Sequence, residues 1–399
     1  MEICSLNGQC GGCLYQGVAY EEQVLLKGKE VKKYIEEKNK YGEVKGLLDK
    51  KDIKYGELFE IQPAPDRYCY RNKMEYTFGD MEKDGPMTLG MHKRGQYMTI
   101  LNVDECQLVH EDFNVIVRAV LDFCRQREYR HYHKKKHDGL MRNLIIRRSE
   151  RYDELLINIV TTTEAEFDGE GFKDMILALP LENSVAGILH TINDNRSDRV
   201  TNEACHILYG RDYYREQIMG LEFQVSAFSF FQTNVAVVER LYTEALSMID
   251  DIEGKTVFDL YCGTGTITQA LALKAKKAVG VEIVEDAVEA ARENAKLNEL
   301  DNCEFIAGDV LQVLDTLADK PDVIVVDPPR AGINYKALPK ILKYGVDQIL
   351  YISCNPKTLV ENLRFMEEHG YVIGDIKAYD NFPFTAHVEC AVLMSRKDT

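Results

Sequence analysis

The second half of the chain alternates short apolar segments with longer helix-like ones. The apolar segments are "KTVFDLYC", "AVGVEI", "CEFIAGD", "PDVIVVDPPR" and "QILYISC", and helix-like stretches such as "EDAVEAARENAKLNEL" lie between them. Strands that alternate with helices at this spacing form a mostly parallel, doubly wound sheet with helices on its faces. We therefore predict an α/β domain over residues 226–399.

The first half has a different pattern. Segments such as "KMEYTFGD", "MTLGMHKRG", "ELLINIVTT" and "VAGILHTIND" alternate in the manner of antiparallel strands, and "AYEEQVLLKGKEVKKYIEEK" is typical of a helix. A chain of 399 residues is also too long for one typical core. We predict a separate α+β domain over residues 1–225.

Composition limits the setting in which the chain works. The chain has a net charge of −16, which argues against a protein that binds nucleic acid over its whole surface. We expect no membrane span, because no apolar run approaches 18 residues, and a cytoplasmic location, because the start lacks signal-peptide features. The eleven cysteines are then expected as thiols or metal ligands. No obligate protein partner is evident, and we expect a monomer.

The basic residues are concentrated in one segment. From Arg125 to Arg148 ("RQREYRHYHKKKHDGLMRNLIIRR") nine Lys and Arg residues face only Glu128 and Asp138. A solvated helix face or loop would also carry such a run, but an excess of one sign in an acidic chain favours contact with a polyanion. We predict a local polyanion-binding surface here.

A glycine-rich turn follows the first predicted strand of the second half. In "DLYCGTGTITQAL", Gly263 and Gly265 allow a tight turn and a close approach of the backbone to a ligand. The next two strands end in Glu282 and Asp309, where they could contact a ribose and an adenine edge. Residue 268 is Thr, not the small third residue of a dinucleotide fingerprint, so a nucleoside ligand such as S-adenosylmethionine fits better than NAD. Solvent-exposed strand-end acids are the alternative.

Two further strand exits carry polar residues. Asp327 in "VDPPRAG" should point into the crevice at the carboxyl ends of the strands. Cys354 in "YISCNP" precedes Asn-Pro, so it should lie on a turn at the end of a strand. A buried cysteine with a packing role is the alternative.

Three more cysteines lie near the start of the chain. Cys4, Cys10 and Cys13 have the spacing C-x5-C-x2-C, and Gly11 and Gly12 allow the chain to wrap tightly. A fourth ligand must come from elsewhere, and four thiolates suit either a [4Fe–4S] cluster or zinc.

Together these motifs resemble the RNA uracil-C5 methyltransferases of the RumA/TrmA type. The resemblance covers nearly the whole chain, through "CSLNGQCGGCLYQ", "YRNKMEYTFG", "LGMHKRG", "FSFFQTN", "DLYCGTGT", "VDPPRAG", "YISCNP" and "FTAHVECAVLM". It implies a Rossmann-like S-adenosylmethionine-dependent domain at residues 226–399 and an iron–sulfur, RNA-binding domain at residues 1–225. Many members begin with a small RNA-binding barrel called TRAM, which the sequence leads us to expect is absent.

The resemblance also implies site residues. It adds Cys106 as the fourth ligand of the [4Fe–4S] cluster and Gln232 as a cofactor contact. We assign the S-adenosylmethionine site to Gln232, Tyr261, Gly263, Gly265, Glu282, Asp309 and Asp327.

The chemistry of uracil explains why the family needs a thiol and a base. C5 of uracil is a poor nucleophile until a thiolate adds to C6, and this is the predicted role of Cys354. Glu389 in "HVECAV" matches the family's base, which removes the C5 proton, and His387 would support it or serve as a second acid or base. A base that must reach such a pocket is expected in single-stranded or loop RNA.

The predicted function is methylation of a specific uridine, most favourably in 23S ribosomal RNA because of the cluster. The same reaction on tRNA is one alternative. A non-catalytic iron–sulfur RNA-binding protein is the other. The sequence does not identify the uridine.

Overall fold

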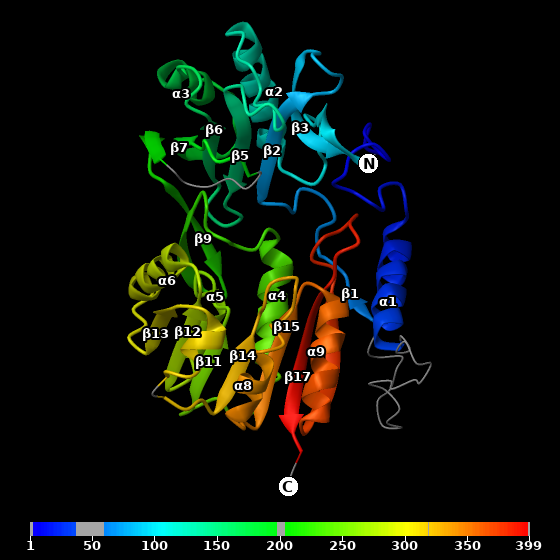
Figure 1. The fold of residues 1–399 in the computed structure, drawn as a ribbon, viewed down its shortest axis with the longest axis vertical. Helices are drawn as coiled ribbons and strands as arrows, with labels where there is room; N and C mark the ends of the chain where they lie inside the picture. Colours follow the sequence, from blue (N-terminus) through cyan, green and yellow to red (C-terminus); the bar gives the residue numbers. More distant parts are fainter. Residues whose placement is uncertain (1–2, 37–59, 198–203, 318, 398–399) are drawn as a thin grey trace. The chain divides into compact units, whose positions relative to one another are not determined.

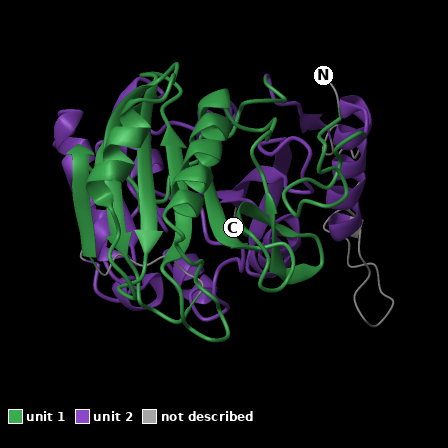
Figure 2. Cartoon of the chain, turned by 90° about the horizontal axis from the view of Figure 1, so that it is seen from above, with its two compact units in different colours: residues 1–17, 66–217, 224–235 green, residues 18–65, 218–223, 236–399 purple. Residues whose placement is uncertain are grey.

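The computed structural model describes residues 3–36, 60–197, 204–317 and 319–397. The chain forms two compact units (Figure 2). Unit 1 contains residues 1–17, 66–217 and 224–235, and unit 2 contains residues 18–65, 218–223 and 236–399. Among the described residues, no helix has both the length and the apolar character that a membrane crossing requires.

Unit 1 is built on a seven-stranded, mostly antiparallel sheet with the order β3-β4-β2-β5-β6-β7-β8. Its strands and helices are β2 (Lys73–Asp80), β3 (Met87–Lys93), β4 (Gln96–Asn102), α2 (Glu111–Gln126), β5 (Met141–Arg148), β6 (Glu154–Thr161), α3 (Gly169–Leu177), β7 (Ser184–Ile192) and β8 (Ala204–Gly210). Helix α2 buries an apolar face, which includes Phe113, Ile116 and Val120, in the same core as these strands. The expected α+β character of the first half is confirmed.

Unit 2 is built on an eight-stranded sheet with the order β1-β16-β17-β15-β14-β11-β12-β13. All its strand pairs are parallel except those of β17. Its strands are β1 (Ile61–Gln62), β11 (Thr256–Leu260), β12 (Lys277–Glu282), β13 (Cys303–Ala307), β14 (Val323–Val326), β15 (Gln348–Ser353), β16 (Tyr371–Tyr379) and β17 (Glu389–Arg396). Strands β9 (Tyr213–Ile218) and β10 (Leu221–Ser226) pair with each other where the chain passes between units.

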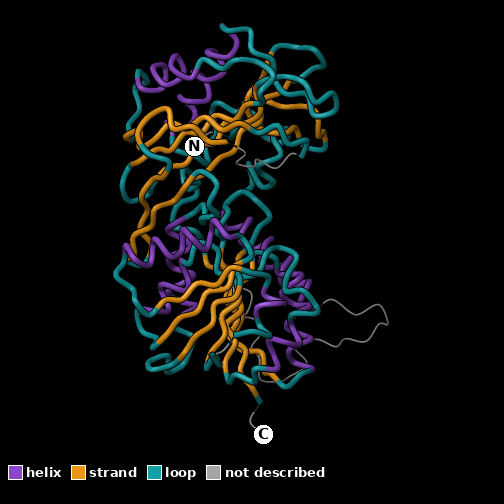
Figure 3. The backbone as a smooth tube through the Cα atoms, turned by 60° about the vertical axis from the view of Figure 1, so that its left-hand side comes forward, coloured by secondary structure: helices purple, strands orange, loops and turns teal. Residues whose placement is uncertain are grey.

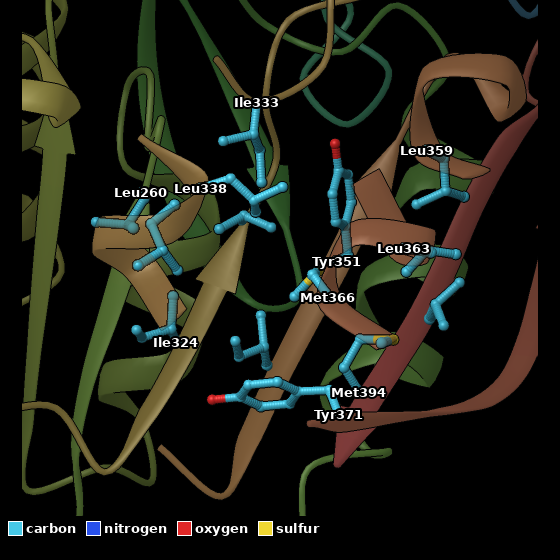
Figure 4. Close-up of a cluster of buried hydrophobic side chains, with 14 of the residues drawn as sticks. Leu260, Ile324, Ile333, Leu338, Tyr351, Leu359, Leu363, Met366, Tyr371 and Met394 are labelled. Atoms are coloured by element: carbon cyan, nitrogen blue, oxygen red, sulfur yellow. The ribbon is translucent and has the colours of Figure 1, made fainter. Parts of the chain in front are cut away.

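Helices lie on both faces of the unit 2 sheet (Figures 1 and 3). They are α1 (Tyr20–Glu36), α4 (Val235–Leu246), α5 (Thr266–Ala272), α6 (Glu285–Leu297), α7 (Val310–Val313), α8 (Leu338–Lys343) and α9 (Pro356–Glu368). Because both faces are covered, β14 ("VIVV") is buried at every position. Its Ile324 packs in one core with Tyr351 of β15 and Leu363 of α9 (Figure 4).

The five strands expected in the second half are β11 to β15, and the expected mostly parallel sheet is confirmed. Strands β1, β16 and β17 of this unit were not expected. Helix α1 was expected as a helix, but it packs against α9 in unit 2. The two units therefore do not follow the expected division at residues 225 and 226, since residues 18–65 group with the carboxyl-terminal half.

Candidate active site at the carboxyl edge of the unit 2 sheet

The glycine-rich turn connects β11 to α5 in a left-handed backbone conformation. Tyr261, Gly263 and Gly265 have φ values of +72°, +54° and +80°. A Cβ atom on Gly265 would lie 2.7 Å from the Phe305 ring, so this glycine permits α5 to pack closely. A Cβ on Gly263 would meet nothing within 4 Å. Gly263 therefore leaves backbone open to a ligand, whereas Gly265 serves packing.

The predicted strand-end acids meet beside this turn, because β11, β12 and β13 are neighbours in the sheet. Glu282 ends β12 and accepts hydrogen bonds from the backbone N–H groups of Gly263 (3.1 Å) and Val284 (3.0 Å). Asp309 follows β13 and caps α7 by accepting from the N–H of Leu311 (2.9 Å). Burial, together with the charge of Asp309, raises the pKa of Tyr261 to about 12. These four predicted cofactor residues, Tyr261, Gly263, Glu282 and Asp309, thus share one edge.

Two carboxyls, one buried and one half-buried, lie near the ends of the neighbouring strands β11 and β14, and the sequence reasoning missed one of them. Asp259 in β11 is completely buried, and Thr268 donates to its Oδ2 (2.6 Å). Burial raises its pKa to about 7. Asp327 directly follows β14, the neighbour of β11, and burial and then the charge of Asp259 raise its pKa to about 7. An acid inside the apolar strand "VFDLY" was the signal that could have identified Asp259.

Cys354 occupies the turn that its sequence context predicts. It directly follows β15 and is half-buried. Asn355 caps α9 by accepting from the N–H of Lys357 (3.2 Å), and Pro356 begins that helix. The strand therefore ends at the thiol, and the Asn-Pro pair turns the chain into α9.

Glu389 lies across from Cys354 on the neighbouring strand. β15 and β17 are antiparallel, and Ser353 pairs with Cys390. One residue further on each strand are Cys354 and Glu389, so the register alone brings these residues together. Glu389 is 5% exposed, and the nearby Asn381 side chain acts to lower the pKa of its carboxyl.

Burial and neighbouring carboxylates both act on the pKa values of Cys354 and Glu389. Burial, followed by the charges of Glu389 and Asp327, raises the pKa of Cys354 to about 12. Burial and then Asp327 raise the pKa of Glu389 to about 8. The guanidinium of Arg330 opposes both shifts. The thiolate is the nucleophile, so Cys354 must lose its proton before it attacks, whereas a carboxylate with a raised pKa holds an accepted proton tightly.

Arg330 is a further site residue that the sequence reasoning did not single out. It follows the "DPP" of the loop after β14, and its backbone oxygen accepts from the Asn355 side chain (2.8 Å). Its Nη2 lies 3.1 Å from His387 Nδ1. A guanidinium can only donate, so His387 accepts at Nδ1, and a neutral ring then carries its proton on Nε2. His387 is thus held by Arg330, which agrees with a supporting role.

Comparison with known proteins identifies the kind of chain that carries this site. A sequence model of the family tRNA (uracil-5-)-methyltransferase matches residues 202–397. A Clostridium tetani protein described as an uncharacterized RNA methyltransferase is 46% identical over 396 residues, which cover 99% of this chain and 84% of that protein. A Clostridium acetobutylicum protein with the same description is 43% identical, with 99% and 84% covered. The chain belongs to this family of RNA methyltransferases.

A solved structure supports the fold of the methyltransferase. The tRNA (uracil-54, C5)-methyltransferase of Pyrococcus abyssi, in complex with S-adenosyl-L-homocysteine, superposes with a TM-score of 0.76. It is 24% identical, and the match covers 96% of this chain and 86% of that one.

One predicted cofactor residue of the methyltransferase belongs to unit 1. Gln232 is in segment 224–235, where its backbone oxygen accepts from the Asn72 side chain (3.1 Å). The other predicted cofactor residues are in unit 2. The assignment of Gln232 therefore stays a prediction that rests on the resemblance.

The four predicted cluster cysteines of the methyltransferase all belong to unit 1 and influence one another. Burial and then the charges of Cys106, Cys10 and Cys4 raise the pKa of Cys13 to about 12. The N–H of Gly12 donates to Cys10 Sγ (3.3 Å). In the part of the chain that the structure describes, however, no group of three or more His, Cys, Asp or Glu residues is arranged as a metal site. The thiols are gathered, but the metal site itself stays a prediction.

The segment from Arg125 to Arg148, predicted as a local polyanion-binding surface, does not present all its basic residues to solvent. Arg142 and Arg147 are only 5% and 1% exposed, and both donate to backbone oxygens of the protein itself. The other four arginines also contact protein groups; these are Arg125, Arg127, Arg130 and Arg148. The lysines differ: Lys135 and Lys136 are exposed, and Lys134 lies over the exposed ring of Tyr97, 4.4 Å from its centroid. We call Lys134–Lys136 the lysine cluster.

Proposed function

We propose that the methyltransferase transfers a methyl group to C5 of a uridine in RNA through a covalent bond between Cys354 and C6 of the base. The observation that carries this proposal is the register of β15 and β17, which sets a thiol beside a buried carboxylate at the edge where the glycine-rich turn opens. S-adenosylmethionine supplies the electrophilic methyl group when it is bound. The turn residue Gly263 and the acids Glu282 and Asp309 would hold its nucleoside part.

The protein's own groups account for the remaining steps. The Cys354 thiolate forms a bond to C6, and the electrons of the C5–C6 double bond move toward O4, which makes C5 nucleophilic. After C5 is methylated, the Glu389 carboxylate takes the C5 proton. The electron pair of that C–H bond re-forms the double bond, and the C6–S bond breaks to release the thiolate. A carboxylate with a raised pKa is a stronger base for this step than an exposed one.

Tritium release tests the site of methylation directly. RNA transcribed with [5-³H]uridine should lose tritium to water only when enzyme and S-adenosylmethionine are both present, in equal amount to the methyl groups transferred. Methyl transfer without tritium release would show that another atom is methylated.

We propose ribosomal RNA as the substrate because of the four-cysteine set. A second candidate is tRNA, favoured by the description of the matching family and by the Pyrococcus abyssi neighbour. Mapping 5-methyluridine in both RNAs from a strain that lacks the gene distinguishes them. The RNA that loses one modified uridine, and regains it when the gene is restored, is the substrate.

We also propose that Cys4, Cys10, Cys13 and Cys106 hold a [4Fe–4S] cluster with a structural role. The donor set supports this proposal: the four thiols are partly buried, the charges of neighbouring cysteines help to raise the pKa of Cys10, Cys13 and Cys106, and a backbone N–H donates to Cys10 Sγ. Four thiolates suit both iron–sulfur clusters and zinc, so metal analysis must decide. Unit 1 would then bind RNA, and unit 2 would carry the reaction.

A further inference from the structure

A long connection joins β16 to Glu389, the first residue of β17, and residues outside the sheet hold it in place. β16 and β17 are antiparallel neighbours, yet residues 380–388 separate them where a tight turn would suffice. We call this segment the 380–388 loop. It contains Asn381, whose side chain acts on the pKa of Glu389, and His387, which Arg330 contacts, and it leads directly into Glu389. The position of Glu389 therefore depends on what fixes this loop.

Helix α1 supplies that fixation through a buried ion pair. Lys27 of α1 is 1% exposed, and its Nζ donates to Asp380 Oδ1 (2.5 Å) and to the backbone oxygen of Phe382 (3.0 Å). Asp380 is also completely buried, and its N–H donates to the backbone oxygen of Gln62 in β1 (2.9 Å). A buried lysine is rare unless paired, and here both of its contacts are with the loop.

A second residue of α1 holds the other half of the loop. Gln23 is completely buried, and its Oε1 accepts from the N–H of Phe384 (3.0 Å). Phe384 has a φ of +66°, which is unfavourable for a bulky residue and persists only where the surroundings impose it. Beyond it, Thr385 N–H donates to Phe382 O (3.1 Å), and His387 N–H donates to the Thr385 hydroxyl (3.2 Å). The loop is thus strained and is held at two points by one helix.

We propose that Lys27 and Gln23 are positioning residues for the proton-removal step, because they hold the 380–388 loop and through it the base Glu389. This inference rests on the proposed function and deepens it. It assigns a role to α1, which is remote in sequence from the reacting residues but belongs to the same unit (purple in Figure 2). The step that depends on them is the transfer of the C5 proton to Glu389, with re-formation of the C5–C6 double bond and release of Cys354.

The test separates formation of the RNA–protein adduct from its release. Lys27→Met removes the ammonium group and nearly keeps the length of the side chain. Gln23→Met likewise removes the amide group and nearly keeps the length. Lys29→Met is the control at an exposed position of α1. The substrate is total RNA from a strain lacking the gene, with [methyl-³H]S-adenosylmethionine. Label that stays with the protein on a denaturing gel reports the methylated adduct.

A misplaced base should slow release without blocking methyl transfer. Both Met variants should accumulate labelled adduct and lose on the order of 100-fold in turnover, the scale of a small misplacement of a catalytic group. Their first-turnover methyl transfer should stay within a few-fold of the wild type. The Lys29→Met control should turn over normally and show no added adduct.

Loss of the fold alone would give another result. It would reduce the number of active sites, while the remaining enzyme turned over at the wild-type rate without adduct, and this would overturn the proposal. Because Lys27→Met leaves Asp380 unpaired and could prevent folding, Gln23→Met then decides, since it leaves the ion pair intact. Glu389→Gln is the reference. If it accumulates adduct and the α1 variants do not, the positioning role alone is wrong; if it does not, the proposed base is wrong.

Discussion

The two glycines in the turn after β11, Gly263 and Gly265, should respond differently to substitution by alanine: Gly265→Ala should cost more stability, and Gly263→Ala should cost more ligand affinity. In Gly265→Ala the new methyl would lie 2.7 and 2.9 Å from Phe305 ring atoms and 3.0 Å from Ala291 Cβ. Phe305 is 5% exposed and packs in a buried cluster with Val288 and Ala291, so it has little freedom to give way. In Gly263→Ala the methyl meets nothing within 4 Å.

The magnitudes follow from these contacts. Both alanines would adopt a left-handed conformation, with φ of +80° and +54°, at a cost of roughly 1–2 kcal/mol each. Overpacking adds about 1–3 kcal/mol at Gly265 only. Gly265→Ala should therefore lower the free energy of unfolding by about 2–5 kcal/mol, and Gly263→Ala by about 1–2 kcal/mol or less.

For ligand affinity we expect the reverse ranking, with Gly263→Ala losing more than Gly265→Ala. The Gly263 methyl would stand in the open space beside Glu282, where we place the nucleoside, so it should weaken S-adenosylhomocysteine binding at least about 10-fold. The assays are urea unfolding followed by circular dichroism, since the chain has no tryptophan, and calorimetric titration of the folded protein. Equal destabilisation by the two alanines would refute the packing argument. Wild-type binding by Gly263→Ala would show that the ligand lies elsewhere.

Three further perturbations have defined outcomes. Asp259→Asn should remove one pH-dependent penalty: the folded-state pKa of Asp259 is raised to about 7, so this group alone lowers wild-type stability by up to about 4 kcal/mol as pH rises from about 4 to 7. The free energy of unfolding of the wild type minus that of the variant should therefore fall over this range, and an equal difference at pH 5 and 8.5 would contradict this. Alanine at Lys134, Lys135 and Lys136 should weaken RNA binding and reduce its log–log salt slope by about 2 without changing S-adenosylhomocysteine affinity, and an unchanged slope in filter binding would place the lysine cluster away from the RNA. Cys106→Ser should bleach the brown colour expected of anaerobically purified enzyme, which should hold about four irons per chain; one zinc in a colourless wild-type protein would overturn the iron–sulfur proposal.

The sequence predicted the elements of unit 2 better than their partners. Runs such as "VIVVDPP" reveal a buried parallel strand because both faces must be apolar. Helix α1 shows its helical pattern equally clearly, but no local signal says which sheet it covers. Its buried Lys27 resembles a surface residue by type, and only the fold brings Asp380 to it.

The predicted exposure of the arginines was wrong for the same reason, because their partners lie far away in the sequence. Arg142 and Arg147 were predicted on a basic surface because charged side chains are usually exposed. Their partners are backbone oxygens of residues 193, 195 and 227, far along the chain, which no local pattern identifies. The three lysines beside them have no such buried role.

In the candidate site, too, some neighbouring residues could be predicted from the sequence and others could not. Strand-end positions predicted the meeting of Glu282 and Asp309, because parallel strands share an edge. The approach of Glu389 to Cys354 depends on the antiparallel insertion of β17 between β15 and β16, which periodicity does not predict. Family resemblance supplied that residue, and the register of β15 and β17 now gives a geometric reason for it.

Trapping the methylated adduct tests the covalent route most directly. Glu389→Gln keeps the thiol and the cofactor site but removes the base, and loss of a positioned base typically costs on the order of 100- to 10,000-fold. Incubated with unmodified RNA and S-adenosylmethionine, it should form a protein–RNA band that survives denaturing electrophoresis, with 5-methyluridine joined to the Cys354 peptide in mass spectrometry. Cys354→Ala should form no adduct and transfer no methyl group, whereas Cys69→Ala, an exposed cysteine of unit 1, should behave as the wild type. Methylation by Cys354→Ala would contradict the covalent mechanism, and normal turnover by Glu389→Gln would assign the proton to another base.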